Sequence, residues 1–182
     1  MYGKKSFLNS AKECAQIAVF VALVIAAQLA LSFIAGVELV TVLFVCFAFI
    51  MGCGRGMVAA TTFSLLRQMV FGADPKVLVL YIVYYNLLTL VFGLLGKKIK
   101  RKGKSILLIT TVACLCTVLF TMLDNGLTAL WLGFSAREAK LYFYASLPVV
   151  IPQTICTAVT VGGLFLPLTN VFSLLKKNSL IG

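Results

Sequence analysis

The chain has 182 residues, of which 62% are hydrophobic and 12% are charged. Soluble domains have about 25% charged residues and roughly half apolar ones, so this composition excludes an ordinary soluble domain and indicates an integral membrane protein. The formal net charge is +11, but the basic residues lie between apolar segments, where attraction to anionic lipid accounts for them. We therefore expect membrane lipid, and no nucleic acid, as the partner of these charges.

Six apolar segments approach or exceed the ~20 residues that cross a ~30 Å hydrocarbon core. The first follows Lys4 and Lys5, as in a signal peptide, but its apolar part is too long for one, so we expect no cleavage. The stretch "GCGRG" predicts a tight turn between the second and third segments; it is too short and wrongly spaced for a phosphate-binding loop. The predicted helices span approximately residues 11–35, 37–53, 56–73, 77–96, 105–124 and 141–175.

Prolines mark two of the later boundaries. Pro75, in the turn "GADPK", prevents the third helix from continuing into the fourth. The last apolar segment, Leu141 to Leu175, is too long for one straight crossing. Three prolines within it can start, kink or end helical pieces, namely Pro148, Pro152 and Pro167.

Basic residues in the short loops predict the orientation. With six crossings and a cytoplasmic N-terminus, twelve basic residues lie on the cytoplasmic side: Lys4, Lys5 and Lys12, then Arg55, six in "KKIKRKGK", and the pair at 176 and 177. Three lie outside, namely Lys76, Arg137 and Lys140. We therefore predict an all-α integral membrane protein, a single membrane domain over residues 1–182, with six transmembrane helices and both termini cytoplasmic.

The residues needed for catalysis are scarce. The chain has no histidine and only five acidic residues, so it lacks the commonest general base and metal ligand and offers little for paired-carboxylate chemistry. Cys114 and Cys116 are two positions apart, on divergent faces of a helix, and make a poor metal pair. We expect no enzymatic activity, no catalytic residue, no metal site and no cofactor in this chain.

One long stretch resembles a known family. "GVELVTVLFVCFAFIMGCGRGMVAATTFSLLRQMVFG" is similar to the second and third helices of S components, the substrate-binding membrane subunits of energy-coupling factor (ECF) transporters. In that family a polar residue opens an apolar helix, a glycine-bounded turn follows, and the third helix ends in an aromatic–glycine pair. Here these are Glu38, the run to Ile50, the turn from Gly52 to Gly56, and Phe71 with Gly72.

The resemblance implies a high-affinity binding subunit of an ABC importer in a prokaryotic cell membrane. Such a subunit captures a vitamin or related micronutrient from outside and docks on a shared transmembrane energising subunit. Two partner ATPase subunits use the ATP. The thiamine branch of the family is rich in tryptophan near its site, whereas this chain has only Trp131, so thiamine is the less expected ligand.

Small residues on the first helix form a candidate docking surface. Ala15, Ala18 and Ala22 are three or four positions apart, a spacing that makes one smooth stripe and lets another helix approach closely. The resemblance implies that this face docks on the energising subunit, since an alanine-rich face does so in the family. The alternative is packing against helices of this protein itself.

Polar and aromatic residues gather in the membrane half predicted to face outside. Ionisable groups within spans are functional suspects, and aromatic walls suit a flat, partly polar ligand. We expect Asp124 to face this cavity, balanced by Arg67. Each group also has a simpler explanation. The aromatic residues could form a belt at the membrane interface, Arg67 could extend its charged end to the membrane surface, and Asp124 could solvate an external loop. The predicted substrate-binding residues are Glu38, Arg67, Gln68, Tyr81, Tyr85, Asp124, Asn125, Trp131 and Gln153.

Two other classes of function remain open. A stand-alone carrier would use Asp124 or Glu38 as a proton-coupling carboxylate and would need no ATPase partner. A structural membrane subunit would bind no ligand, and its polar residues would only join helices.

Overall fold

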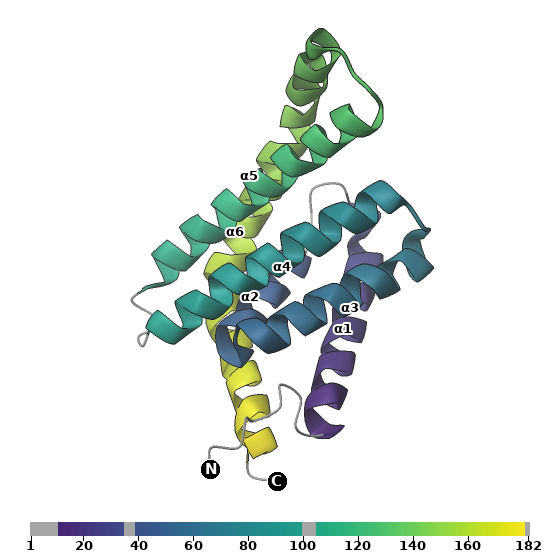
Figure 1. The fold of residues 1–182 in the computed structure, drawn as a ribbon. Coiled ribbons are helices and arrows are strands. Elements are labelled where there is room, and N and C mark those ends of the chain that lie inside the picture. Colours follow the sequence, from purple (N-terminus) through teal and green to yellow (C-terminus); the bar gives the residue numbers. More distant parts are fainter. Residues whose placement is uncertain (1–10, 35–38, 100–104, 181–182) are drawn as a thin grey trace, which may run out of the picture.

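The computed structural model describes residues 11–34, 39–99 and 105–180, and this part of the chain folds as helices without strands (Figure 1). Four of the helices are long and apolar enough to cross a membrane. The fold is therefore all-helical and has the helices of an integral membrane protein. The elements are α1 (Ala11–Leu31), α2 (Val40–Met51), α3 (Cys53–Phe71), α4 (Pro75–Lys98), α5 (Ile106–Trp131) and α6 (Ala136–Leu180).

The core forms around α2, the shortest helix. Every residue of α2 except Ile50 is buried, as expected for a helix that is apolar on all sides. Aromatic rings join it to its neighbours: the Phe47 ring stacks on Phe20 of α1 with centroids 3.9 Å apart, and Phe44 lies 4.8 Å from Tyr85 of α4. Because α4 and α6 are its main neighbours, α2 is enclosed rather than facing lipid.

Glycines permit the tight packing at one end of α2. Gly52 has φ +92°, a conformation that favours glycine, and it separates α2 from α3. A Cβ on Gly96 would lie 2.1 Å from the Phe49 carbonyl oxygen, and one on Gly93 would lie 2.5 Å from the Cys53 nitrogen. The last turns of α4 can therefore contact the α2–α3 turn backbone to backbone.

Helix ends and basic residues meet at this same end of the molecule. Gln16 Nε2 of α1 donates to the Leu175 carbonyl of α6 at 3.0 Å, and Arg55 at the start of α3 pairs with Glu13 of α1. The first and last helices therefore begin and end side by side (Figure 1). We call this region the basic end, defined by Lys12, Arg55, Lys97, Lys98, Lys176 and Lys177.

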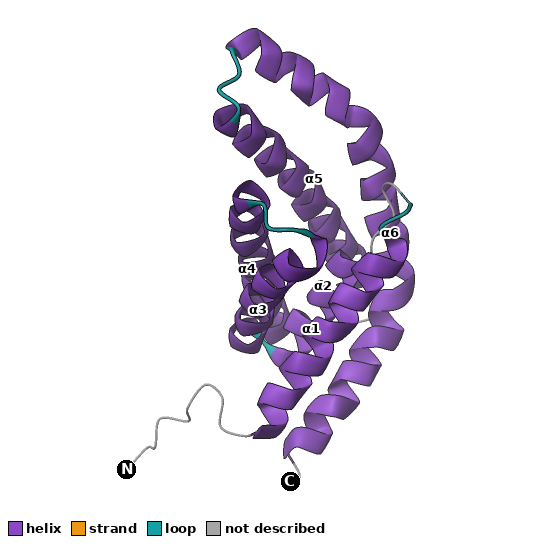
Figure 2. Ribbon diagram, turned by 90° about the vertical axis from the view of Figure 1, so that its right-hand side faces the viewer, coloured by secondary structure: helices purple, strands orange, loops and turns teal. Residues whose placement is uncertain are grey.

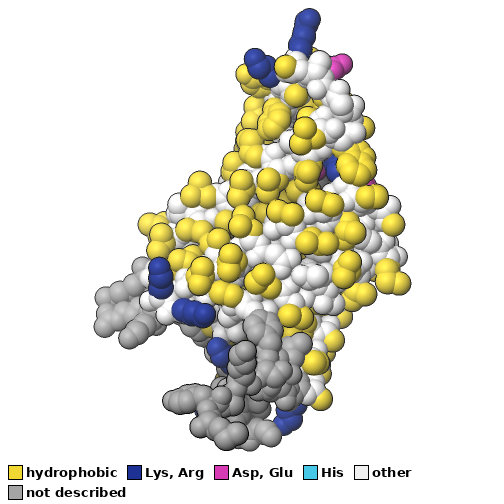
Figure 3. Space-filling model, viewed as in Figure 1, with side chains coloured by type: hydrophobic (Ala, Val, Ile, Leu, Met, Phe, Trp, Pro, Cys, Tyr) yellow, Lys and Arg dark blue, Asp and Glu magenta, His cyan; other side chains and the backbone are white. Residues whose placement is uncertain are grey.

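The α3–α4 turn, residues 72–74, lies at the other end, which we call the opposite end. Asp74 caps α4 there by accepting a hydrogen bond from the Lys76 backbone N–H at 2.9 Å, and Pro75 occupies the first turn of the helix, where proline is well tolerated. Figure 3 shows hydrophobic side chains over the middle of one face, with Lys and Arg side chains mainly toward its top and lower parts.

The α5–α6 hairpin differs from the predicted boundaries. The prediction ended the fifth helix at residue 124 and began the sixth at 141, whereas α5 runs to Trp131 and α6 begins at Ala136. A single Gly126 costs a helix only about 1 kcal/mol, which packing against α6 outweighs. The Ser135 backbone N–H also donates to Glu138 Oε2 at 2.7 Å, and the Glu138 N–H donates to Ser135 Oγ at 3.4 Å. This capping box starts α6 early.

The last helix is continuous through its prolines. It has 45 residues and contains Pro148, Pro152 and Pro167. Each proline removes a backbone hydrogen bond and bends a helix, and α6 curves along its length (Figure 2). Of the alternatives that the sequence left open, the prolines bend this helix rather than end it.

Candidate functional site

Arg67 is the cationic centre of the site, and two aromatic rings hold it. It lies on α3, and its guanidinium carbon is 4.3 Å from the ring centroid of Tyr81 on α4 and 4.9 Å from that of Phe71. Such cation–π contacts are attractive, more strongly so away from water. The Nε atom of Arg67 is buried and has no hydrogen-bond partner in the structure. The structure therefore brings Arg67 and Tyr81 together.

Gln28 of α1 completes this arrangement, and the sequence analysis did not single it out. Its Nε2 donates to the Tyr81 hydroxyl at 3.2 Å, while its Oε1 is buried without a hydrogen-bond partner. A signal was present in the sequence, since Gln28 is the one amide between Gln16 and Ser32 in an otherwise apolar run. Polar side chains inside a membrane helix usually have a partner or a function.

Gln68 joins the site to the α3–α4 turn. Its Oε1 accepts from the Asp74 backbone N–H at 3.1 Å, and its Nε2 is buried without a hydrogen-bond partner. We call Gln28, Arg67, Gln68 and Tyr81 the polar cluster. It offers a buried acceptor on α1 and two buried donors on α3 that no group among the described residues satisfies, although buried polar groups in proteins are nearly always hydrogen-bonded.

Tyr85 supports the polar cluster from behind. Its side chain is 2% exposed, and its ring centroid lies 5.2 Å from that of Tyr81 and 5.2 Å from that of Phe63. Phe120 of α5 contacts the other side of Tyr81 at 5.9 Å. Tyr85 therefore belongs to the aromatic core, where it fixes the position of Tyr81.

Asp124 pairs with Lys76 rather than with Arg67. The Lys76 Nζ lies 3.0 Å from Asp124 Oδ1 and donates to Thr128 Oγ1 at 2.8 Å. In the described residues Arg67 has no ion pair, so the expectation that Arg67 balances Asp124 was wrong. The sequence concealed the true partner because Lys76 is 48 positions away. The start of α4 lies beside the last turns of α5, which brings the two side chains together.

Asn125 lines a separate cavity of about 240 Å³ between α5 and α6. Its side chain is 2% exposed, and its Nδ2 donates to Ser146 Oγ at 2.7 Å. Asp124 lines the same cavity. The two residues therefore lie inside a helical hairpin, not in an external loop. The lining residues are Thr121, Asp124, Asn125, Tyr142, Ala145, Ser146 and Val149.

Two of the remaining predicted site residues, Trp131 and Gln153, lie on α5 and α6. Trp131 is 61% exposed at the end of α5. Gln153 is half-buried on α6. Glu38 lies outside the described residues. Of the nine predicted residues, Arg67 and Tyr81 are thus in direct contact and Gln68 follows Arg67 on α3, while Asp124 and Asn125 belong to the α5–α6 cavity.

The alanine stripe faces outward. Ala15, Ala18 and Ala22 are all exposed, while Val21 and Val24 on the other side of α1 are buried. Ala18 and Ala22 line an apolar groove of about 470 Å³ between α1 and α3. The stripe is therefore a surface of the folded chain and not part of its core.

No family model matches the chain, and comparisons with curated proteins and with solved structures also give no match. The function is therefore argued from the geometry of the site and from the resemblance described above.

Proposed function

We propose that this chain is the substrate-binding membrane subunit of an ECF-type importer and that the polar cluster binds its ligand. One observation carries the proposal: Gln28 Oε1, Arg67 Nε and Gln68 Nε2 are buried and lack hydrogen-bond partners within residues 11–34, 39–99 and 105–180. Leaving a buried polar group unsatisfied costs about 1–3 kcal/mol, more for a charged one. A ligand that satisfies the three atoms recovers this free energy.

The chemistry of the polar cluster defines the ligand. Arg67 contributes a fixed positive charge, which favours an anionic or strongly accepting group on the ligand. Gln68 adds a donor and Gln28 an acceptor, and Tyr81 contributes an aromatic face. A small molecule with a flat ring, one acidic group and a nearby donor fits these features. A vitamin or related micronutrient has this character.

The charge distribution supports an orientation. Under the proposal the basic end is cytoplasmic, as expected from the excess of Lys and Arg in short cytoplasmic loops. Both termini are then cytoplasmic, six helices cross a prokaryotic cell membrane, and the polar cluster faces outside. Capture from outside requires this arrangement.

The exposed alanine stripe supports a docking surface for the energising subunit. Ala15, Ala18 and Ala22 present little side-chain bulk, so a partner helix can approach the α1 backbone closely. ATP hydrolysis is assigned to two partner subunits. This chain binds the substrate and delivers it to the energising subunits.

The test begins with the purified protein in mild detergent, from which the retained small molecule is released and identified by mass spectrometry. Removing one charge-assisted hydrogen bond weakens binding by roughly 1.5–3 kcal/mol, or about 10- to 150-fold. We expect Arg67→Gln to weaken binding of that molecule within this range. Gln28→Leu removes a neutral acceptor and should weaken binding by about 0.5–1.5 kcal/mol, or roughly 2- to 13-fold. Trp131→Phe, at an exposed position away from the polar cluster, is the matched control and should bind normally.

Two results would contradict the proposal. The first is a wild-type protein that retains no small molecule and binds none from a panel of vitamins. The second is unchanged affinity in both cluster variants together with a lower melting temperature, which would make the polar cluster a structural contact.

A stand-alone carrier is the second candidate, and the Lys76–Asp124 pair favours it. The side chains of Lys76 and Asp124 are 18% and 34% exposed, and Asp124 borders the α5–α6 cavity. Ionisable residues within membrane helices often belong to ion or substrate pathways. Uptake into proteoliposomes that contain only this chain, driven by a pH gradient and lost in Asp124→Asn, would favour the carrier. Uptake that requires ATP and partner subunits would favour the importer.

A further inference from the structure

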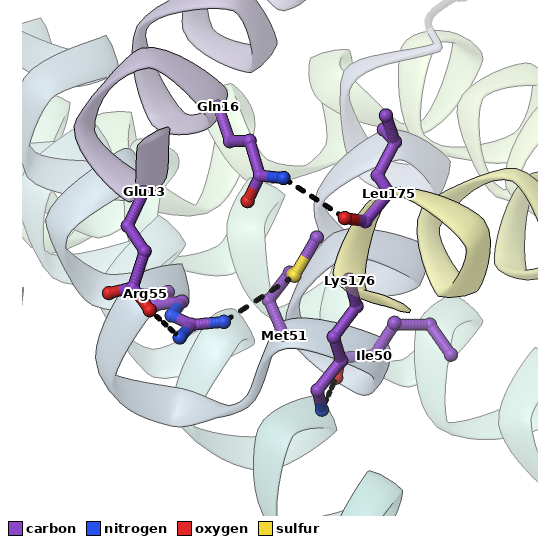
Figure 4. Close-up of polar contacts among 7 residues, drawn as sticks. All are labelled: Glu13, Gln16, Ile50, Met51, Arg55, Leu175 and Lys176. Atoms are coloured by element: carbon purple, nitrogen blue, oxygen red, sulfur yellow. Dashed lines mark hydrogen bonds and ion pairs between the residues drawn. The ribbon is translucent and has the colours of Figure 1, made fainter. Parts of the chain in front are cut away.

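One side of α6 packs against the rest of the chain near the basic end. Phe165 and Phe172 on this side are buried. The Leu175 carbonyl accepts a hydrogen bond from Gln16 of α1, and Lys176 Nζ donates to a backbone carbonyl of α2 (Figure 4). These contacts with α1 and α2 hold one side of the helix inward. The opposite side therefore faces away from the protein.

Four residues on this outward side have the spacing of a helix-pairing surface. Val159, Gly163, Leu166 and Asn170 are all exposed, and they follow one another at intervals of four, three and four positions. Residues at these intervals form one stripe along an α-helix, and paired helices contact each other through such stripes. We call these four residues the α6 seam.

Asn170 is the polar side chain of the α6 seam. It is the one amide between residues 154 and 175, a stretch without a charged residue. It stands six residues before Lys176, or about 9 Å along the helix, so it lies in the hydrocarbon when the lysines of the basic end lie at the membrane surface. Its backbone carbonyl accepts from Ser173 Oγ at 2.8 Å, but its side-chain amide has no hydrogen bond to any other described residue.

Pro167 leaves a second polar group on the same stretch of α6. A proline has no N–H, so the carbonyl four positions earlier loses its helical donor. That carbonyl belongs to Gly163, which has no side chain to cover it, and nothing from the rest of the chain lies within 4 Å of its Cβ position. Polar groups without partners are costly in hydrocarbon, and polar side chains of membrane helices therefore usually face another helix.

The chemistry of Asn170 suits a second copy of this chain. A carboxamide has both a donor and an acceptor, so two Asn170 side chains related by a two-fold axis can hydrogen-bond to each other. Two copies in one membrane have the same orientation, so the axis runs along the membrane normal and places each seam residue opposite itself. Gly163 then faces Gly163, where the lack of side chains lets the helices approach closely. An acyl chain of a lipid offers the amide no partner.

We propose that the protein forms a parallel, two-fold symmetric dimer through the α6 seam, in which Asn170 is hydrogen-bonded to Asn170 of the second copy. One polar residue in a seam of paired helices fixes the register of the pair, and Val159 and Leu166 add apolar contact. The proposal does not depend on what the polar cluster binds, because the α6 seam contains none of its residues.

The experiment measures the monomer–dimer equilibrium of the full chain in a bilayer. Ala136→Cys, in a background without native cysteines, carries one dye on each copy, and the protein is reconstituted into phosphatidylcholine vesicles at a series of protein-to-lipid ratios. Photobleaching steps then count the copies in each complex. We expect a fraction of dimers that rises with the protein-to-lipid ratio. Protein that stays monomeric at every ratio would overturn the proposal.

Substitutions in the α6 seam test its chemistry. Asn170→Leu removes the amide and should weaken dimerisation about 5-fold or more, equivalent to roughly 1 kcal/mol. Gly163→Leu holds the two helices apart and should weaken it at least as much. Both side chains enter open space, so the melting temperature of the monomer should not fall.

Two substitutions on α5 are the matched controls. Thr111 is exposed, and its hydroxyl donates to the Leu107 carbonyl of its own helix at 2.9 Å, so Thr111→Val removes a polar group that needs no second copy. Gly126 is a helical glycine with nothing within 4 Å of its Cβ position, so Gly126→Leu adds the same bulk as Gly163→Leu. Both controls should dimerise normally. Equal weakening by the seam and control variants would show unspecific association and overturn the proposal.

Cysteine cross-linking locates the contact. In the background without native cysteines, Leu166→Cys should give a disulfide-linked dimer on oxidation with copper–phenanthroline, because the two-fold axis places residue 166 opposite itself. Val83→Cys, at a valine of α4 that is 52% exposed, should stay unlinked under the same oxidation. A dimer that cross-links through position 83, or one that does not cross-link through position 166, would place the interface elsewhere.

Discussion

At the scale of single residues, the charged side chains of the opposite end have two different environments. Arg67 lies over two rings, with its Nε unsatisfied, and Lys76 forms a compact network with Asp124 and Thr128. Guanidinium is weakly hydrated and stacks on rings, whereas an ammonium is a strongly hydrated point charge that needs oxygen acceptors. The two residues therefore suit different tasks: under the proposed function Arg67 binds the ligand, whereas Lys76 connects α4 to α5.

Breaking the Lys76–Asp124 contact should lower the stability of the protein. Lys76→Met leaves the half-buried Asp124 carboxylate unpaired and should lower the free energy of unfolding by about 1–3 kcal/mol, less than the 3–5 kcal/mol seen for fully buried pairs. The double variant Lys76→Met with Asp124→Leu should recover most of that loss. Unfolding in detergent of the wild type, both single variants and the double variant measures the coupling. Additive effects would show that the two side chains act independently.

At the scale of helices, α4 is the element that positions the polar cluster. Its first half carries Tyr81, and its last turns press on the α2–α3 turn at Gly93 and Gly96. Helices that touch backbone to backbone cannot slide or rotate without a clash. The contact of α4 with the α2–α3 turn at the basic end therefore helps to fix the position of Tyr81 at the opposite end.

Two glycine substitutions test this contact with opposite expected signs. Gly96→Ala places a methyl group 2.1 Å from the Phe49 carbonyl oxygen, so we expect destabilisation by about 1–3 kcal/mol. Gly126→Ala is also within a helix, but nothing lies within 4 Å of its Cβ position, so we expect stabilisation by about 0.4–1 kcal/mol. Melting temperatures of the two variants in the same detergent give the comparison. A Gly96→Ala protein as stable as Gly126→Ala would mean that α4 packs less closely than described.

At the scale of the whole molecule, the sequence predicted the kind and order of the helices better than their contacts. Apolar length identified the segments, and the sequence analysis placed Arg67 and Tyr81 in the same half of the membrane. The sequence contained no information on which helix lies beside α5, so Lys76 could not be recognised as the partner of Asp124. Asn125 and Gly126 resembled a helix end because local propensity disfavours them, but the hydrogen bond from Asn125 to Ser146 keeps α5 helical.

Topology is the prediction that belongs to this scale. None of the six native cysteines forms a disulfide, so they are first replaced to give a background without thiols. Lys98→Cys at the basic end should react with an impermeant thiol reagent only after the membrane is opened. Ala136→Cys, exposed at the start of α6, should react in intact cells. The reverse pattern would place the polar cluster on the cytoplasmic side and remove the basis for uptake from outside.

The length of α6 has a consequence for the outer shape of the protein in a bilayer. Its 45 residues extend roughly 67 Å along the helix path. Even at a steep tilt of 40°, crossing a 30 Å hydrocarbon layer uses about 39 Å of helix. More than a third of α6 must therefore lie outside the hydrocarbon layer. The first turns of α6 and the end of α5 project from that layer together. Leu130, Trp131 and Leu132, each more than half exposed, then meet headgroups or water.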